Sequence, residues 1–178
     1  AIGAHVKRIV LTSSMSVYGN QDPPFSENMA TKPVVIYGIA KTAMEEATKT
    51  LSVVHGIEYT ILRPHNVYGP RQNIADPYRN VIGIFINCLL QGKKFYIYGD
   101  GTQKRSFSYI DDIIPSLVTA GIQKNTSGEL INIGPRVEYS VNHIAQIILG
   151  EFTHNQAIPH HLRPVHVPER PLEVKNAF

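Results

Sequence analysis

The first third of the chain alternates between short apolar runs and polar loops. Ile9, Val10 and Leu11 form an unbroken apolar run that ends near Thr12, a pattern typical of a strand buried on both faces of a parallel sheet. A loop rich in Pro, Asn and Asp then covers residues 19–33. The pattern therefore predicts a buried strand followed by a surface loop.

A helix is predicted after this loop, because apolar residues recur there at helical spacing with charged residues between them. We expect it to end near Gly56, and we expect Ile57–Pro64 to form a second strand that the proline stops. This order of strand, helix and strand implies a right-handed parallel crossover and an α/β fold. The apolar helix positions are Ala40, Ala43, Met44, Ala47, Leu51 and Val54, and the charged ones are Glu45, Glu46 and Lys49.

Beyond Pro70 the predicted elements are shorter and mixed. They are a helix over 81–91, a strand over 95–101, a segment over 105–113 that leads into another helix, a strand over 129–134 and a helix over 141–149. Such pieces suggest a smaller α/β lobe attached to the parallel sheet. We therefore divide the chain into residues 1–70, with later segments returning to that part, and residues 71–178. The tail over 154–178 has too few periodic apolar residues to predict an element.

Composition narrows the class of protein. The 178 residues are 43% hydrophobic and 17% charged, which is the balance of a globular chain. The net charge is +3 without a basic run longer than two residues, so we expect no nucleic-acid partner. The longest apolar run, Val81–Leu90, is too short to span a bilayer, and the first residues carry no signal pattern. We expect a cytoplasmic protein without a membrane partner.

Cysteine and histidine usage bears on redox chemistry and on metals. A single cysteine, Cys88, excludes a disulfide scaffold. Four histidines lie in the proline-broken tail, without a helical pair of histidines or a supporting cysteine. We therefore predict no metal site.

Candidate chemistry begins with Tyr37 and Lys41, which lie four residues apart near the start of the predicted helix. Their side chains share a face, and an ammonium beside a phenol favours the phenolate that a general base requires. Ser13 and Ser14 follow the first strand, at the end of a parallel sheet where α/β folds keep their binding crevice. A solvated Tyr–Lys pair and simple backbone capping by the serines are the alternatives.

Six ordered motifs give the chain a resemblance to the extended short-chain dehydrogenase/reductase family, the NAD-dependent sugar-nucleotide epimerases and dehydratases, and most closely to UDP-glucose 4-epimerase-like members. The resemblance implies the later part of a Rossmann-type parallel sheet with a smaller, mixed α/β, substrate-binding lobe. The motifs are TSSMSVYG at 12–19, YGIAK at 37–41, LRPHNVYGPRQ at 62–72, YGDGTQKRSFSYIDD at 98–112, INIG at 131–134 and PERPLEV at 168–174.

The resemblance also implies roles for individual residues. Ser14, Tyr37 and Lys41 form the catalytic set, with Tyr37 as the acid/base and Lys41 on the cofactor ribose. Residues implied to bind the NAD cofactor are Thr12, Ser13, Tyr37, Lys41, Pro64 and His65. Residues implied to bind the UDP-sugar substrate are Ser14, Asn66, Ile97, Tyr98, Arg105, Arg170 and Glu173. Of these, Arg105 and Arg170 are implied to clamp the diphosphate, and surface ion pairs with neighbouring acids are the alternative for both.

Two departures from the family pattern matter. The chain has no GxxGxxG or GxGxxG motif, which normally seats the dinucleotide pyrophosphate. We therefore expect the chain to be the later portion of a longer enzyme, truncated at both ends. In addition, Met15 and Ser16 stand where related dehydratases and decarboxylases carry acids, and neither side chain exchanges protons usefully at neutral pH.

These features favour epimerisation of a UDP-hexose by transient hydride transfer over dehydration. An NADP-linked sugar-nucleotide reductase and a non-catalytic fragment or binding module remain alternatives. The side of the predicted helix that carries Ala43, Ala47 and Leu51, taken with the resemblance, predicts a homodimer.

Overall fold

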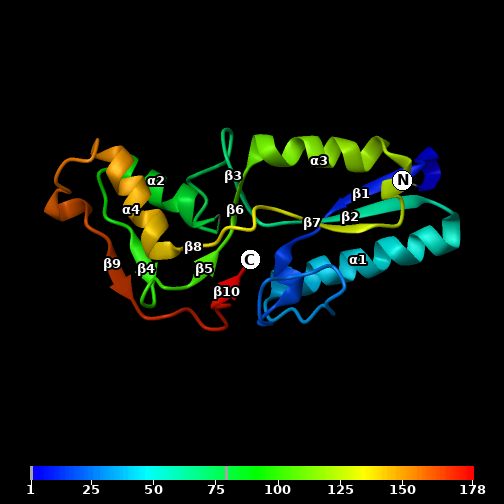
Figure 1. Ribbon diagram of the computed structural model, residues 1–178, viewed down its shortest axis with the longest axis horizontal. Helices are drawn as coiled ribbons and strands as arrows, with labels where there is room; N and C mark the ends of the chain where they lie inside the picture. The colour runs from blue at the N-terminus through cyan, green and yellow to red at the C-terminus, as the bar shows by residue number, and fades with distance from the viewer. Residues whose placement is uncertain (1, 79) are drawn as a thin grey trace.

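The computed structural model of the protein describes residues 2–78 and 80–178. The molecule is elongated, with a three-layered sheet part at one end and a smaller lobe at the other (Figure 1). Among the described residues, no helix combines the length and apolarity needed to cross a membrane.

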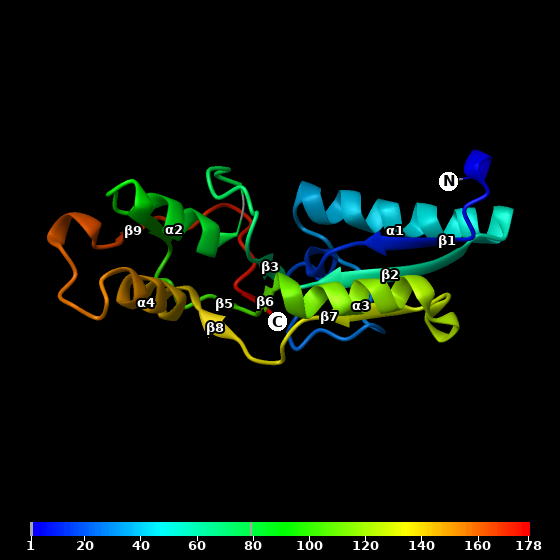
Figure 2. The same ribbon diagram turned by 90° about the horizontal axis from the view of Figure 1, so that it is seen from above.

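The sheet part has one helix on each face of a parallel sheet. Its strands are β1 (Arg8–Thr12), β2 (Glu58–Pro64) and β7 (Leu130–Ile133), with β2 in the centre. Helices α1 (Ile36–His55) and α3 (Ile110–Ile122) lie on opposite sides of the sheet (Figure 2). The predicted α/β fold, the crossover and the end of α1 at Gly56 are confirmed, and Gly56 adopts the left-handed φ of 65° that a helix C-cap favours.

One expectation about β1 is wrong. The strand is not buried on both faces, because Ile9 and Val10 are only half-buried. β1 lies at the edge of the described sheet, paired with β2 on one side, so neighbouring side chains cover less of it than of β2.

The buried side of α1 is not its apolar side. The side buried against the rest of the sheet part carries Gly38, Glu45 and Thr48. Most of the apolar positions that mark the helix in the sequence are exposed: Ala40, Ala43, Met44, Ala47 and Val54. The buried carboxylate of Glu45, paired with Arg63 on β2, thus holds the helix against the sheet, and an apolar stripe remains on the surface.

The smaller lobe is built on two packed helices, α2 (Val81–Leu90) and α4 (Val141–Phe152). Phe85 stacks on Phe95 at 4.0 Å between ring centroids, and Ile97 and Leu149 complete the centre of this core. The strands around it are β4 (Tyr96–Tyr98), β5 (Lys104–Arg105), β8 (Tyr139–Ser140), β9 (Val165–Val167) and β10 (Asn176–Ala177). β4 pairs with β9, and β5 lies between β10 and β8. The predicted helices at 81–91 and 141–149 are confirmed.

The two parts are joined by a pair of parallel strands, β3 (Asn66–Tyr68) and β6 (Phe107–Tyr109). Neither β3 nor the strands of the tail, β9 and β10, is predicted by the sequence pattern, because each has only two or three residues. The tail returns from the lobe to the junction, where the C-terminus lies (Figure 1). There the amide of Phe25 donates to the carbonyl of Phe178 at 2.9 Å. Short 3₁₀ helices occupy Ile2–Ala4, Met15–Tyr18, Lys124–Thr126 and His160–Leu162.

Candidate active site

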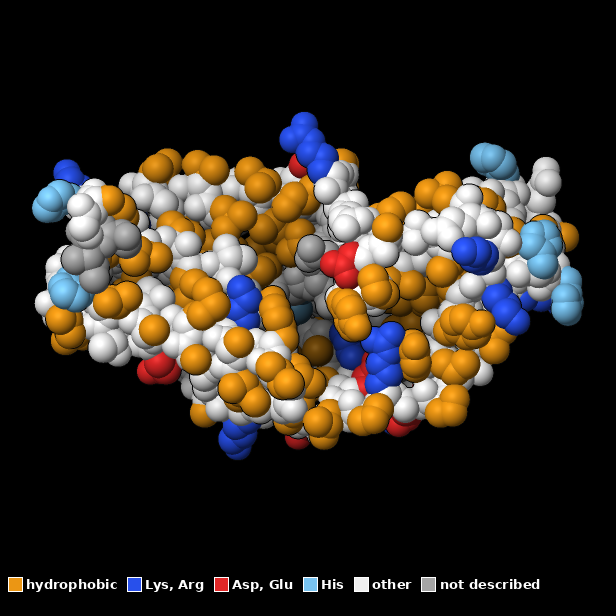
Figure 3. Space-filling view, turned by 180° about the vertical axis from the view of Figure 1, so that it is seen from behind, with side chains coloured by type: hydrophobic (Ala, Val, Ile, Leu, Met, Phe, Trp, Pro, Cys, Tyr) orange, Lys and Arg blue, Asp and Glu red, His pale blue; other side chains and the backbone are white. Residues whose placement is uncertain are grey.

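Two adjoining cavities lie where the sheet part meets the lobe. The first, about 600 Å³, opens at the carboxyl ends of β1 and β2, and the second, about 320 Å³, lies in the lobe. Both are lined by Asn66 and Arg105. Figure 3 shows the molecule hollowed near this junction. The first is lined by Thr12, Ser13, Ser14, Tyr37, Lys41, Pro64 and His65, and the second by Ile97, Tyr98, Arg170 and Glu173. The fold thus brings together every residue that the sequence predicts for the site.

Two glycines set the position of Tyr37 at the mouth of the first cavity. A Cβ on Gly38, in the first turn of α1, would lie 2.5 Å from the Ser16 carbonyl oxygen, so only glycine allows the helix to approach this closely. Gly19 has a φ of 64°, and a Cβ there would lie 1.8 Å from the Lys32 carbonyl oxygen. The helix start is therefore held against the loop that follows Ser14.

The ammonium of Lys41 lies between Tyr37 and the end of β1. Its Nζ donates to the Thr12 carbonyl at 2.8 Å and lies 5.7 Å from the centre of the Tyr37 ring. Tyr37 itself is 57% exposed, so a ligand in the cleft can reach its hydroxyl. A fixed cation beside an accessible phenol is the arrangement that general acid–base chemistry by tyrosine requires.

The two serines after β1 have different surroundings. Ser14 caps the following 3₁₀ turn, and its Oγ accepts a hydrogen bond from the Ser16 amide at 3.2 Å. This leaves the hydroxyl proton of Ser14 for a molecule in the cavity. The hydroxyl of Ser13 instead donates to the buried carboxylate of Glu45 at 2.5 Å. Ser13 therefore lines the cavity while its hydroxyl is engaged behind it.

His65 is a buried, neutral imidazole at the end of β2. Burial lowers its pKa, although the contact of Nδ1 with the Ile133 carbonyl, 3.3 Å away, acts in the opposite direction. With the proton on Nδ1, the buried Nε2 is an acceptor, and no partner for it occurs among the described residues. Gly134 makes room for this ring, because a Cβ there would lie 2.0 Å from Nδ1.

Arg105 is held by the returning tail. Its guanidinium donates to the carbonyls of Lys104 at 2.8 Å and Lys175 at 2.9 Å, and also to the carbonyl of Val174. The carboxylate of Glu173 lies 3.7 Å away. Burial lowers the pKa of Arg105, and Glu173 partly opposes this shift. Arg105 thus lines both cavities, but these donors are directed to backbone oxygens.

The second cavity contains a stacked pair. The guanidinium carbon of Arg170 lies 3.8 Å from the centre of the Tyr98 ring. Ile97 directly precedes Tyr98 on β4. It is buried in the lobe core at 2% exposure and contributes to the cavity wall. A flat cation on an aromatic ring provides a surface on which a planar base or a phosphate can lie.

Several lining residues are not found by the sequence reasoning. Asn80 caps α2, accepting from the Gly83 amide at 3.3 Å and donating to the Val67 carbonyl at 2.6 Å. An asparagine directly before an apolar run is the available signal for such a cap. Gln72 and Tyr78 lie on the loop before it, and Val174 and Ala177 on the tail. No periodic pattern marks these four positions.

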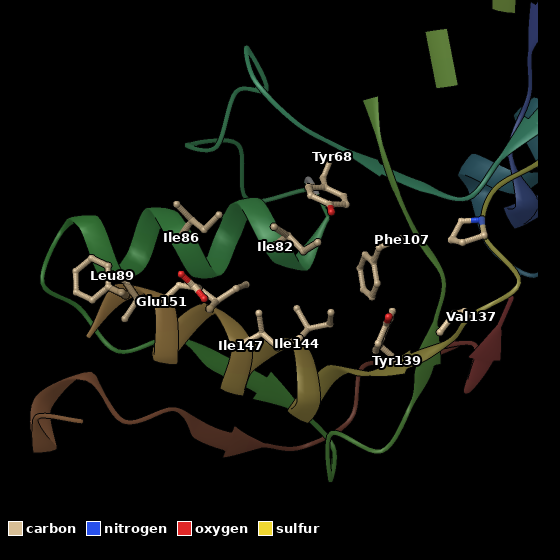
Figure 4. A pocket seen from close by; sticks show the side chains of 13 residues that line it. Tyr68, Ile82, Ile86, Leu89, Phe107, Val137, Tyr139, Ile144, Ile147 and Glu151 are labelled. Atoms are coloured by element: carbon tan, nitrogen blue, oxygen red, sulfur yellow. The ribbon is translucent and has the colours of Figure 1, made fainter. Parts of the chain in front are cut away.

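A cavity of about 730 Å³ also lies in the lobe, between α2 and α4. Figure 4 shows Ile82 and Ile86 facing Ile144 and Ile147 across it. Among the described residues that line it, Glu151 is the one with a charged side chain. The described residues also hold no group of three His, Cys, Asp or Glu that could bind a metal ion. The candidate active site is therefore the cleft with Ser14, Tyr37 and Lys41.

Comparison with known proteins agrees with this geometry. The model of the NAD dependent epimerase/dehydratase family matches residues 1–134. A UDP-N-acetyl-alpha-D-glucosaminuronate decarboxylase of Bacillus cytotoxicus is 37% identical over 168 residues, covering 91% of this chain and 50% of the relative. A putative UDP-glucose 4-epimerase of Methanocaldococcus jannaschii is 40% identical over 148 residues, covering 82% of this chain and 47% of the relative.

A solved structure gives the same comparison in three dimensions. The UDP-glucuronic acid 4-epimerase of Bacillus cereus, in complex with UDP-glucuronic acid and NAD, superposes with a TM-score of 0.85 at 32% identity, covering 98% of this chain and 53% of that one. The chain thus spans about half the length of the relatives it matches.

Proposed function

Because the chain belongs to the NAD-dependent epimerase/dehydratase family, we propose that its cleft epimerises a UDP-hexose at carbon four, with NAD as the cofactor. The observation that carries this proposal is the convergence of Ser14, Tyr37 and Lys41 at the carboxyl end of a parallel sheet. In this proposal the sheet part holds the cofactor and the lobe holds the nucleotide.

The residues present fit the nicotinamide end of NAD. Lys41 lies within reach of a ribose in the cleft, and the unpartnered Nε2 of His65 is an acceptor for an amide group. The sequence of this chain contains no GxxGxxG or GxGxxG motif, the kind that seats the pyrophosphate of a dinucleotide. When bound, NAD would take up a hydride from the sugar carbon and return it.

Proton transfer is assigned to the side chains of the cleft. Tyr37 takes the proton of the sugar hydroxyl as the hydride leaves, and it returns the proton after the ketone has turned over. The ammonium of Lys41 lies 5.7 Å from the centre of the Tyr37 ring, and Ser14 donates a hydrogen bond to the reacting oxygen. In the second cavity, Tyr98 and Arg170 would hold the base and diphosphate, with Arg105 and Glu173 at their edge.

Epimerisation is favoured over dehydration and decarboxylation by what lies beside Ser14. Met15 is buried in an apolar cluster, and Ser16 lines the cavity with a hydroxyl. Neither side chain can serve as a proton-transferring acid or base at neutral pH. The carboxylate that an elimination would use is therefore not supplied at these positions.

The test is Tyr37→Phe in the polypeptide that carries this chain. We expect turnover of UDP-glucose to UDP-galactose, or of UDP-glucuronate to its 4-epimer, to fall about 100- to 10,000-fold, because a general acid or base is lost. UDP-sugar affinity should stay within a few-fold. Tyr139→Phe, which lies in the α2–α4 cavity, is the matched control. Equal activity of the parent and Tyr37→Phe contradicts the mechanism. Net reduction of the sugar by the parent indicates a reductase. Binding of the UDP-sugar without turnover in the parent indicates a binding module.

We also propose that α1 mediates a homodimer. Its exposed stripe has small residues at the centre, Ala40, Ala43 and Ala47, and larger apolar residues at the ends, Ile36 and Val54. Small central residues allow two helices to approach closely. Ala47→Glu should convert the dimer to a monomer in light scattering, because it places a charge at the centre of the contact. A parent that is monomeric at high concentration contradicts the proposal.

A further inference from the structure

A buried ion pair connects α1 to β2 behind the candidate active site. Glu45 is 0% exposed and Arg63 is 2% exposed. Arg63 Nε donates to one carboxylate oxygen of Glu45 at 2.9 Å, and Nη2 donates to the other at 2.6 Å. Ser13 donates to the first oxygen at 2.5 Å. The carboxylate, on helix α1, thus receives hydrogen bonds from strand β2 and from the residue that directly follows β1.

The network continues into the loop after Ser14. The guanidinium of Arg63 lies 4.6 Å from the centre of the buried Tyr18 ring. The Tyr18 hydroxyl in turn donates to Asn132 Oδ1 on β7 at 2.8 Å. The group therefore connects α1, the loop that follows β1, and the strands β2 and β7.

Each of Ser13, Glu45 and Arg63 lies close in sequence to other residues that line the cleft. Ser13 lies between Thr12, whose carbonyl accepts from Lys41, and Ser14. Arg63 directly precedes Pro64 and His65, and Glu45 lies one helical turn after Lys41. The network therefore fixes the three backbone segments that carry the proposed catalytic and cofactor-binding side chains.

Neither charged partner can take part in the chemistry directly. Glu45 and Arg63 are not among the residues that line the two cavities of the cleft. Burial alone would raise the pKa of Glu45, but the hydrogen bonds from Arg63 and Ser13 outweigh it and hold this pKa below its ordinary value. Glu45 is thus a permanent carboxylate at neutral pH and not a proton carrier.

Stability alone is a poor reason for this arrangement. A buried ion pair gains little over well-packed apolar side chains of similar volume, because removing both charges from water is costly. A two-point bond between the flat guanidinium and the carboxylate instead fixes direction as well as distance. An error of about 1 Å in the placement of a reacting group can cost about 100-fold in rate.

We infer that Ser13, Glu45 and Arg63 are positioning residues, which fix α1 against the ends of β1 and β2 so that Tyr37, Lys41 and Ser14 share one geometry. The inference rests on the proposed function, since it concerns the same catalytic set. It predicts that a chain with apolar side chains in place of these three residues can remain stably folded while the relative positions of Tyr37, Lys41 and Ser14 change.

The experiment replaces the whole network by apolar side chains of similar size, as S13A/E45M/R63M. The control is Thr48→Val, on the same buried face of α1, where the hydroxyl donates to Met44 within the helix at 2.8 Å. In the active polypeptide we expect kcat of the triple variant to fall about 100-fold, with KM for the UDP-sugar within a few-fold. Thr48→Val should keep kcat.

A second readout does not depend on activity. The aromatic ¹H–¹³C resonance of Tyr37, assigned with Tyr37→Phe, is recorded in the 178-residue chain. Tyr37 lies two helical turns from Glu45, so the ring reports the seating of α1 and not the local substitution. We expect the resonance to move in the triple variant and to stay in place in Thr48→Val.

A triple variant with kcat within a few-fold of the parent, or with an unmoved Tyr37 resonance, overturns the inference. If the triple variant does not fold, Glu45→Gln, which keeps the shape and one acceptor oxygen, is measured in the same two ways. A parent without epimerase activity refutes the proposed function, and the Tyr37 resonance then decides the positioning role alone.

Discussion

Removing one partner of the Glu45–Arg63 pair should be far more damaging than removing both. Arg63→Met deletes two charge-assisted hydrogen bonds, of 2.9 and 2.6 Å, and leaves a carboxylate without its counter-charge at a fully buried position. Hydrogen bonds to charged groups contribute about 1.5–3 kcal/mol each. Their sum agrees with the loss of about 3–5 kcal/mol observed when buried ion pairs are broken. We expect the double variant E45M/R63M to recover more than half of that loss.

The loss of stability in Arg63→Met should depend on pH, because the substitution changes the pKa of Glu45. In the parent the pKa of Glu45 is lowered below the ordinary 4.5, so its contribution to stability is complete above that pH and is lost as the pH falls through the lowered pKa. In Arg63→Met, only the Ser13 hydrogen bond and the charge of Lys49 still oppose burial, so the pKa of Glu45 should rise relative to the parent. The cost of burying the Glu45 carboxylate without its counter-charge is then present at neutral pH, and it disappears as the carboxylate takes up a proton. The difference in stability between parent and variant should therefore narrow on acidification.

The assay is urea denaturation followed by circular dichroism, because the chain contains no tryptophan for fluorescence. The free energy of unfolding of the parent, Arg63→Met and E45M/R63M is compared at neutral pH and at about pH 5, where a raised carboxyl pKa takes effect. Equal losses at both pH values would refute the reasoning. A double variant as unstable as the sum of the two single variants would do the same.

Two further predictions concern the cleft. Gly134→Ala should displace the His65 ring, because the added Cβ would lie 2.0 Å from Nδ1. Cofactor affinity, measured by calorimetry, should then fall at least tenfold. The control is Gly121→Ala, whose Cβ has no neighbour closer than 3.7 Å and which should leave cofactor affinity unchanged. Arg170→Leu removes the cation stacked 3.8 Å from the Tyr98 ring, and UDP affinity should fall about tenfold, in keeping with about 1–2 kcal/mol for a partly desolvated cation–π contact. Unchanged affinity in either variant would contradict the assigned role.

The elements of the sheet part could be predicted because their signals are local. An apolar run that ends in small hydroxyl residues marks β1, and Gly56 marks the end of α1. The orientation of α1 could not be predicted in this way, because periodicity separates apolar from polar positions without showing which side is buried. Arg63, within the apolar run of β2, was the available signal: an arginine that deep needs a buried acid.

The sequence predicted which residues meet in the cleft, but it did not predict how the tail packs beside them. Ser14, Tyr37 and Lys41 come from segments separated in sequence, and the motif order places them at one end of the sheet, where the structure has them. The tail was not predictable, because β10 has two residues and is stabilised by pairing with β5 and by the contact with Phe25. Contacts of this kind depend on the finished fold and leave no periodic pattern.

The number of connections between the two parts has a mechanical consequence. Among the described segments, the chain passes between sheet part and lobe at β3, at β6, between β7 and β8, and again in the tail, where β10 pairs with β5 and Phe178 contacts Phe25 (Figure 1). A joint of one or two strands bends easily, whereas this one must deform four segments together, including the paired β3 and β6. The joint is therefore stiff. The lobe presents Arg170 and Tyr98 to the cleft at a distance from Tyr37 that is set during folding, so little ordering entropy is lost when a ligand arrives.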